Sequence, residues 1–267
     1  MDPIEFRLAG DDLQFVEMRL AAGQTAVGEP GAMMFMDDGV TMDTVLGDGS
    51  KRSNFVVRLA RGLKRMFTGE SMFTCVFHNP SGEAKRVAFA APYAGKIVPI
   101  DLATVGGRLI CQRGAFLCAA QGVELGIAFQ KRLRAGFFGG EGFIMQHLSG
   151  DGPVFVHASG MLSQMRLDAG QTLRVDTGCL VALQTSVQYD IRFAGRVKTA
   201  LFGGEGLFFA TLRGPGTVWL QSLPVRRMAA RMIADGLRAR SSSVGARLYL
   251  LIFIAAILIS LFMGPPV

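Results

Sequence analysis

The stretch Phe202-Gly203-Gly204-Glu205-Gly206 decides the fold, because the chain contains three versions of it. The second version is Phe138-Gly139-Gly140-Glu141-Gly142, and the first is the looser Phe67-Thr68-Gly69-Glu70-Ser71. A valine stands 18 residues before the glutamate in the later two versions and 30 residues before it in the first, at Val123, Val187 and Val40 respectively. Landmarks that recur in a fixed order with a near-constant period of 64 residues predict an internal triplication.

Spaced pairs of glycines accompany these landmarks in each unit. They are Gly23 and Gly31, Gly106 and Gly114, and Gly170 and Gly178. The longer first unit carries an insertion of about 12 residues, and residues 51–65 contain six basic residues and no acid. Apolar residues at helical spacing across 55–66 predict a short basic amphipathic helix that packs on the body, with membrane-surface contact as the alternative.

The units themselves have the alternating pattern of β-strands. Residues 4–8 and 16–20 alternate around the turn at 10–12, which predicts a hairpin. Residues 181–193 alternate without interruption, which predicts one long strand with a buried and a wet face. Each unit ends on a short apolar strand, at 87–89, 154–156 and 218–220. We expect an all-β domain over residues 1–224, with three repeats around a pseudo-threefold axis in a sandwich-like or barrel-like arrangement.

The net charge of +7 is concentrated near the C-terminus. From Val225 onward the chain has one acid, Asp235, and six arginines: Arg226, Arg227, Arg231, Arg238, Arg240 and Arg247. The remaining 22 basic and 20 acidic residues nearly balance, so the body lacks the excess of basic residues on which nucleic-acid affinity depends. We therefore expect no nucleic-acid partner.

The C-terminal region predicts a membrane anchor. Residues 225–246 are expected to form a basic, helical connector, and residues 247–264 a hydrophobic tail helix, within which residues 248–263 carry no charge. Sixteen apolar residues are slightly fewer than a bilayer requires, so an apolar helix buried in an oligomer is the alternative. The basic residues precede the apolar stretch, which predicts a single-pass protein of the cell inner membrane with the β domain in the cytoplasm.

The three recurring glutamates, Glu70, Glu141 and Glu205, are the candidate ligand-binding residues. Three carboxylates around a pseudo-threefold axis could bind a metal ion or a small molecule. The competing interpretation is structural, because a carboxylate between glycines accepts backbone N–H bonds and stabilises the turn.

Other motifs point away from catalysis. The four cysteines form no CxxC pair, which favours reduced thiols without zinc. His147 and His157 could meet across a hairpin as metal ligands, although isolated strand histidines are more often packing residues. No GxSxG nucleophile motif, P-loop or dinucleotide fingerprint is present. We expect no enzyme, no resident metal and no cofactor.

Four motifs, taken together, resemble a known family. They are residues 61–71, 95–102, 175–178 and 202–207, and the match extends over roughly residues 4–223. They resemble the mitochondrial biogenesis family named for altered inheritance of mitochondria, whose bacterial members are uncharacterised. The resemblance implies a fold related to the tryptophan RNA-binding attenuator protein, three internal repeats and homo-oligomers. It supplies no catalytic residues, and basic residues do not recur between the units as RNA binding requires.

These observations lead to two expectations for function. The first is a non-enzymatic, membrane-anchored β scaffold that self-associates and organises the membrane or protein partners. The alternative is a small-molecule or metal-binding module, conceivably an enzyme, that uses the Gly-Glu turns.

Overall fold

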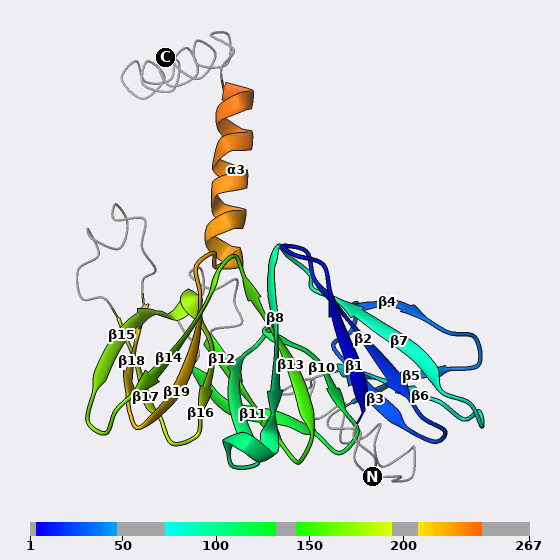
Figure 1. The fold of residues 1–267 in the computed structure, drawn as a ribbon. Helices are drawn as coiled ribbons and strands as arrows, with labels where there is room; N and C mark the ends of the chain where they lie inside the picture. The colour runs from blue at the N-terminus through cyan, green and yellow to red at the C-terminus, as the bar shows by residue number, and fades with distance from the viewer. Residues whose placement is uncertain (1–3, 47–72, 132–142, 194–207, 242–267) are drawn as a thin grey trace, which may run out of the picture. The chain divides into compact units, whose positions relative to one another are not determined.

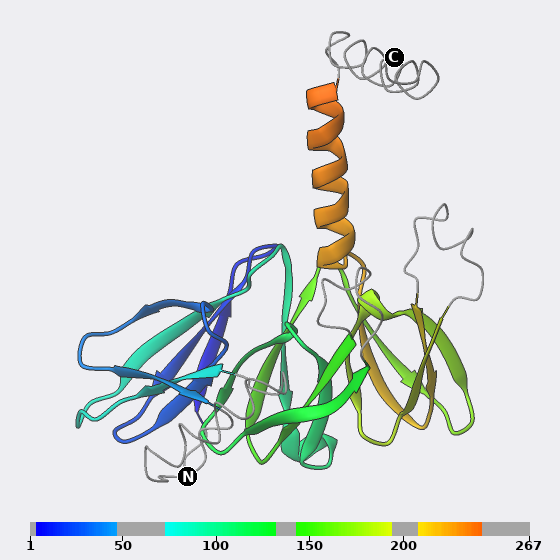
Figure 2. The same ribbon diagram turned by 180° about the vertical axis from the view of Figure 1, so that it is seen from behind.

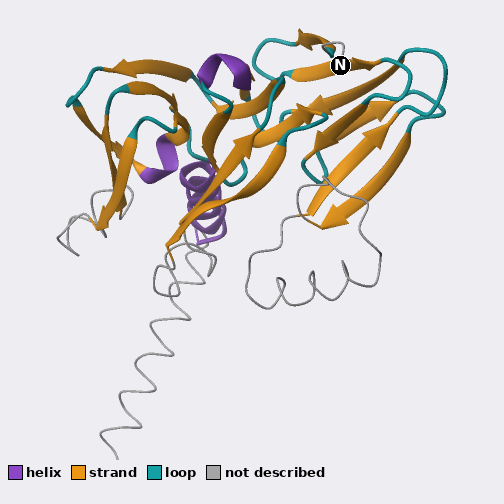
Figure 3. Cartoon of the chain, turned by 90° about the horizontal axis from the view of Figure 1, so that it is seen from below, coloured by secondary structure: helices purple, strands orange, loops and turns teal. Residues whose placement is uncertain are grey.

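The computed structural model describes residues 4–46, 73–131, 143–193 and 208–241. The described part consists mainly of antiparallel β-strands, which confirms the all-β prediction (Figure 1, Figure 3). The chain divides into two compact units, Met1–Pro224 and Val225–Val267. The first unit is called the body below.

The strands of the body form four antiparallel sheets, A to D. Sheet A has the order β1 (Glu5–Ala9), β2 (Phe15–Leu20), β7 (Lys85–Ala90) and β4 (Met33–Met36). Sheet B has the order β5 (Thr41–Leu46), β6 (Phe73–His78), β3 (Thr25–Gly28), β10 (Phe116–Ala120), β13 (Pro153–Ser159) and β8 (Gly95–Asp101). Sheet C has the order β11 (Glu124–Lys131), β12 (Phe143–Ser149), β9 (Arg108–Gln112), β16 (Leu180–Gln184), β19 (Gly216–Gln221) and β14 (Leu162–Leu167). Sheet D has the order β15 (Thr172–Asp176), β18 (Phe208–Arg213) and β17 (Gln188–Phe193).

The strands β2 to β7, β8 to β13 and β14 to β19 make three groups of six consecutive strands, and each group has the same pattern of pairings. Within each group of six strands the first and third strands pair with the sixth, and the second and fourth strands pair with the fifth. Consecutive groups are joined by one further pair, β3 with β10 and β9 with β16. Two short 3₁₀ helices, η1 (Leu102–Val105) and η2 (Thr177–Cys179), follow the first strand of the second group and the second strand of the third group.

The third strand of every group contains a β-bulge at the corresponding position. The register shifts between Met33 and Phe35 in β4, between Phe116 and Cys118 in β10, and between Leu180 and Ala182 in β16. The extra residues are therefore Met34, Leu117 and Val181. A bulge increases the local twist of a strand, so the three strands bend at equivalent points.

The apolar side chains form three cores between successive sheets. The first core joins sheets A and B through residues such as Phe89 and Phe77. The second joins sheets B and C and includes Trp219, and the third joins sheets C and D and includes Leu212. Sheets B and C therefore face a core on both sides, which explains why every residue of β10 is buried.

Several sequence-based strand predictions are confirmed, and one is wrong. The predicted hairpin forms, because β1 and β2 pair antiparallel, and the three short apolar strands correspond to β7, β13 and β19. The single long strand predicted over residues 181–193 is instead two strands, β16 and β17, in different sheets. The carbonyl of Gln184 accepts the N–H of Val187 at 3.0 Å, and the resulting turn divides the alternating pattern.

The second unit contains one described helix, α3 (Val225–Ser241), which lies within the basic, helical connector expected over residues 225–246. No helix within the described ranges is long and apolar enough to cross a membrane. The predicted single-pass anchor in the inner membrane is therefore wrong. The helix described in this region, α3, carries five arginines along its length, which a hydrocarbon environment does not accommodate, so α3 does not supply the anchor. The tail 247–264 and the basic insertion 51–66 lie outside the described residues.

Candidate functional site, an exposed edge strand

The residues proposed from sequence as a ligand site are not among those described. Glu70, Glu141 and Glu205 fall in segments 47–72, 132–142 and 194–207. These segments connect β5 to β6, β11 to β12 and β17 to β18, which are the fourth and fifth strands of each group. The glutamates thus occupy equivalent connections in the chain, and their role as ligands or turn residues stays a prediction. Of the basic residues near the C-terminus, Arg226, Arg227, Arg231, Arg238 and Arg240 belong to α3, and Arg247 lies outside the described part.

The two histidines considered as metal ligands lie on strands of different sheets. His147 is in β12 of sheet C, and His157 is in β13 of sheet B, so no hairpin brings them together. The Nε2 of His157 lies 2.9 Å from the carbonyl oxygen of Tyr93, to which it donates a hydrogen bond. Burial lowers the pKa of His157, which favours the neutral ring. Within the described ranges, no three His, Cys, Asp or Glu residues are placed to hold a metal ion.

One half-buried carboxyl group lies at the junction of the first two groups. Glu29 follows β3 directly, and its N–H donates to the carbonyl of Leu117 in β10 at 2.9 Å. Burial raises the pKa of Glu29 to about 7, although the charge of Arg113 acts in the opposite direction. Burial together with the charge of Glu29 also raises the pKa of Cys111, so this thiol is a poor nucleophile.

The most unusual surface feature of the body is β4. This strand consists of Met33, Met34, Phe35 and Met36, and it is the last strand of sheet A. Its three methionines are 37%, 55% and 37% exposed. An exposed, apolar strand at a sheet edge presents unpaired N–H and C=O groups as a template for another strand. It is therefore the candidate functional site.

The edge strand is held in place by Arg86 of β7. The guanidinium of Arg86 binds the carboxylate of Asp37 through two contacts, Nη2 to Oδ1 at 2.9 Å and Nε to Oδ2 at 3.1 Å. The same guanidinium lies 5.7 Å from the ring centroid of Phe35, which is a cation–π arrangement. Hydrogen bonds from Arg86 lower the pKa of Asp37, so the fork stays ionised near neutral pH.

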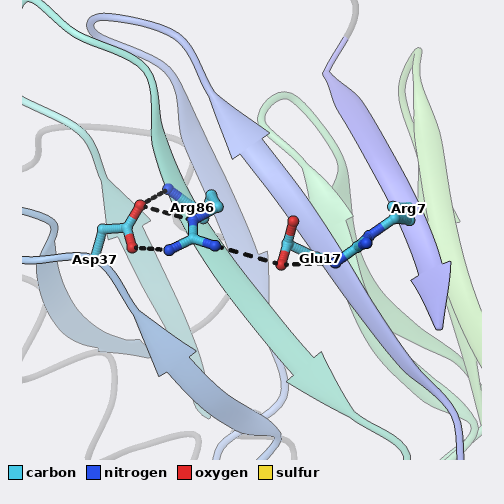
Figure 4. Close-up of polar contacts among 4 residues, drawn as sticks. All are labelled: Arg7, Glu17, Asp37 and Arg86. Atoms are coloured by element: carbon cyan, nitrogen blue, oxygen red, sulfur yellow. Dashed lines mark hydrogen bonds and ion pairs between the residues drawn. The ribbon is translucent and has the colours of Figure 1, made fainter. Parts of the chain in front are cut away.

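Figure 4 shows that this pair continues into a row of charges across sheet A. Arg86 also lies 4.0 Å from Glu17 on β2, which in turn accepts from Arg7 on β1 at 3.4 Å. The row covers the face of the sheet with paired charges. The backbone edge of β4 has no strand beside it other than β7 within the described residues.

Comparisons with known proteins agree with this architecture. The profile of the family described as mitochondrial biogenesis AIM24 matches residues 6–223, which is most of the chain. The chain belongs to the AIM24 family. An uncharacterised protein of Streptococcus pyogenes serotype M6 is 29% identical over 218 residues, covering 81% of this chain and 84% of its own length.

The fold of the AIM24 chain also resembles a crystal structure of a Streptococcus pyogenes protein. The two share 23% sequence identity with a TM-score of 0.69, and the match covers 87% of this chain and 99% of the other. This likeness shows the shared fold.

Residue periodicity does not single out β4 in the AIM24 chain. Four consecutive apolar residues, three of them methionine, follow Gly31 and Ala32 without the alternation that marks an amphipathic strand. A continuous apolar run is typical of a strand that is buried on both faces. The sequence contains the apolar run, but only the structure shows that this run lies at a sheet edge.

Proposed function

We propose that this AIM24-family protein is a non-enzymatic β scaffold that self-associates through the edges of its sheets and presents repeated surfaces to partner proteins. The observation that carries the proposal is the exposed apolar edge strand β4. Monomeric proteins normally protect such edges with charges, prolines or covering segments. Pairing with a second chain removes β4 from water and completes its hydrogen bonds.

The proposal includes the internal triplication of the body. The three groups of six strands share one pairing scheme, equivalent bulges and equivalent joints, which supports three copies of one structural unit. Gly23, Gly106 and Gly170 stand at equivalent points, and all three have φ between 75° and 85°. A body made of repeats that stack by one rule has the same surfaces available for stacking between chains.

Sedimentation of the purified full-length chain tests this function. We expect the average mass to rise with protein concentration above the monomer value of 28.7 kDa. The double substitution Met34→Lys, Met36→Lys should weaken self-association at least about tenfold, because lysines on an edge strand oppose strand pairing. Met161→Lys is the matched control, since Met161 is 77% exposed and lies outside β4, and it should behave like the parent.

A parent chain that stays monomeric over the whole concentration range contradicts the proposed function. Equal loss of association in the Met161→Lys control would mean that added charge, rather than the edge, is responsible.

A further inference from the structure

The two joints inside the body, where consecutive groups of six strands pair, define how one group stacks on the next. In the first joint β3 pairs antiparallel with β10, and in the second joint β9 pairs antiparallel with β16. The first joint unites the strands β5-β6-β3 with the strands β10-β13-β8 in sheet B. The second joint unites the strands β11-β12-β9 with the strands β16-β19-β14 in sheet C. Sheets B and C are therefore each the sum of a half from one unit and a half from the next.

Sheets A and D are the two halves that remain. Sheet D contains β17, β18 and β15 in the order found in the first half of sheets B and C. Sheet A contains β4, β7 and β2 in the order found in the second half, with β1 added outside. Their open edges, β15 and β4, belong to opposite ends of the body (Figure 1, Figure 2). One chain therefore cannot pair its own two edges.

Burial shows which edge lacks its partner. The strands equivalent to β4 are β10, which is entirely buried, and β16, in which four of five residues are buried. β4 is equally apolar, yet none of its residues is buried. β10 and β16 differ from β4 in two ways: their sheets face a core on both sides, and each has a neighbour from the preceding group of strands, whereas β4 pairs with β7 alone in the described part of the chain.

We propose that β4 of one chain pairs antiparallel with β15 of a second copy, so that sheets A and D merge into one continuous sheet like sheets B and C. This inference rests on the proposed self-association and names its surface and its partner. The interface is head-to-tail, because two different edges meet, and repetition of it leads to a ring or a filament.

The internal joints also predict the register. In the first joint Val27 lies opposite Ala119, and in the second joint Ile110 lies opposite Leu183. On the bulged strand, Ala119 and Leu183 each lie two residues after the extra residue of the bulge, and the corresponding residue of β4 is Met36. On the other strand, Val27 and Ile110 each lie four residues after the recurring glycine, and the corresponding residue of β15 is Arg174. The equivalent pair is therefore Met36 of one chain and Arg174 of the partner subunit. On either side of the first pair, Glu29 N–H donates to Leu117 O at 2.9 Å and Gln121 N–H donates to Thr25 O at 3.0 Å.

Alternation along an antiparallel ladder makes Val27 and Ala119 a hydrogen-bonded pair, and the same follows for Met36 and Arg174. The N–H of Asp37 donates to the carbonyl of Arg86 of β7, so alternation also directs the N–H of Met36 away from β7 and toward the open edge.

Arg174 occupies the position of the apolar Val27 and Ile110. A charged residue at this position makes the joint between chains weaker than the internal joints, and therefore dependent on concentration.

Complementation between two blocked variants of the full-length chain tests the inference. Met36→Pro removes the outward N–H of β4, and Arg174→Pro removes that of β15. Each variant alone should sediment as a monomer, while the parent forms species larger than a dimer. A mixture of the two variants should give a species of twice the monomer mass, because one intact β15 edge and one intact β4 edge remain. Met36→Pro mixed with the Met34→Lys, Met36→Lys variant should stay monomeric, since both are blocked at β4.

Thermal melts by circular dichroism show whether each variant is folded. If Arg174→Pro melts earlier than the parent, Arg174→Asp replaces it, because that change places a carboxylate next to Asp37 of the partner subunit without altering the backbone. Self-association of the Arg174 variants equal to that of the parent overturns the inference and leaves the proposed function intact. A parent chain that is itself monomeric overturns both.

Discussion

At the scale of single residues, Glu29 is a carboxyl group whose surroundings change its affinity for a proton. Its pKa is about 7 in the folded chain, raised by burial from an ordinary value of 4.5. The folded state therefore binds the proton more tightly than the unfolded state. Below pH 4.5 both states are protonated and burial of this group carries no charge penalty. Stability falls as the pH rises from 4.5 to 7, and the full penalty, roughly 2–3 kcal/mol, is present above pH 7.

We therefore predict that Glu29→Gln increases the free energy of unfolding by roughly 2 kcal/mol at pH 8 and leaves it nearly unchanged at pH 4.5. Urea unfolding of the variant and the parent at both pH values measures the difference. Glu83→Gln, at an exposed glutamate, is the matched control and should have little effect at either pH. If Glu29→Gln increases the free energy of unfolding by the same amount at both pH values, the charge of Glu29 is not the cause of the increase.

At the scale of strands, β4 and β10 occupy the same place in their groups but differ in their neighbours. Ala119 in β10 is fully buried between β3 and β13, whereas Met36 in β4 faces an open edge. We predict that Ala119→Pro destabilises the folded monomer by about 3 kcal/mol or more, because it breaks a ladder bond and leaves a buried carbonyl unpaired. Met36→Pro should cost less than about 1 kcal/mol at concentrations where the parent is monomeric.

Thermal and urea unfolding of the two proline variants measure this contrast. If Met36→Pro lowers the free energy of unfolding as much as Ala119→Pro does, the pairing scheme is contradicted. Such a loss would mean that Met36 lies inside a complete sheet within the single chain.

The sequence allowed many strands to be predicted, because alternation and turn residues are local signals. The hairpin of β1 and β2 and the short strands β7, β13 and β19 follow from such signals. The division of residues 181–193 could not be predicted, because Thr185 and Ser186 fit the alternation while lying in a turn between two sheets. The candidate site was missed for a related reason. The apolar run of β4 acquires meaning only when its place at a sheet edge is known.

At the scale of the whole body, sheets B and C combine strands from consecutive groups, and the cores lie between successive sheets. The recurring glycine and valine landmarks predict a triplication, but pairs such as β3 with β10 join residues about 90 positions apart and leave no local pattern. The membrane anchor was predicted from the apolar residues 247–264 and the basic residues before them, and the helix described in this region is the arginine-bearing α3. We propose that the incomplete sheets A and D are completed between chains.

Cysteine cross-linking tests the pairing of β4 with β15 of a second copy. The full-length double variant Met36→Cys, Arg174→Cys places two thiols at directly opposed positions of the proposed joint, where Cα atoms about 5.5 Å apart permit a disulfide. Met36→Cys, Gln188→Cys is the matched control, because β17 lies two strands beyond β15 and thus about 10 Å further away. The parent measures the background from its own cysteines, of which three are buried.

Mild oxidation followed by a non-reducing gel gives the result. We expect dimers and higher oligomers linked by disulfides in the Met36→Cys, Arg174→Cys variant. Reductant should abolish them, and the control and the parent should show only background linkage. Self-associated protein in which the Arg174 pair forms no more linkage than the Gln188 control would contradict this pairing.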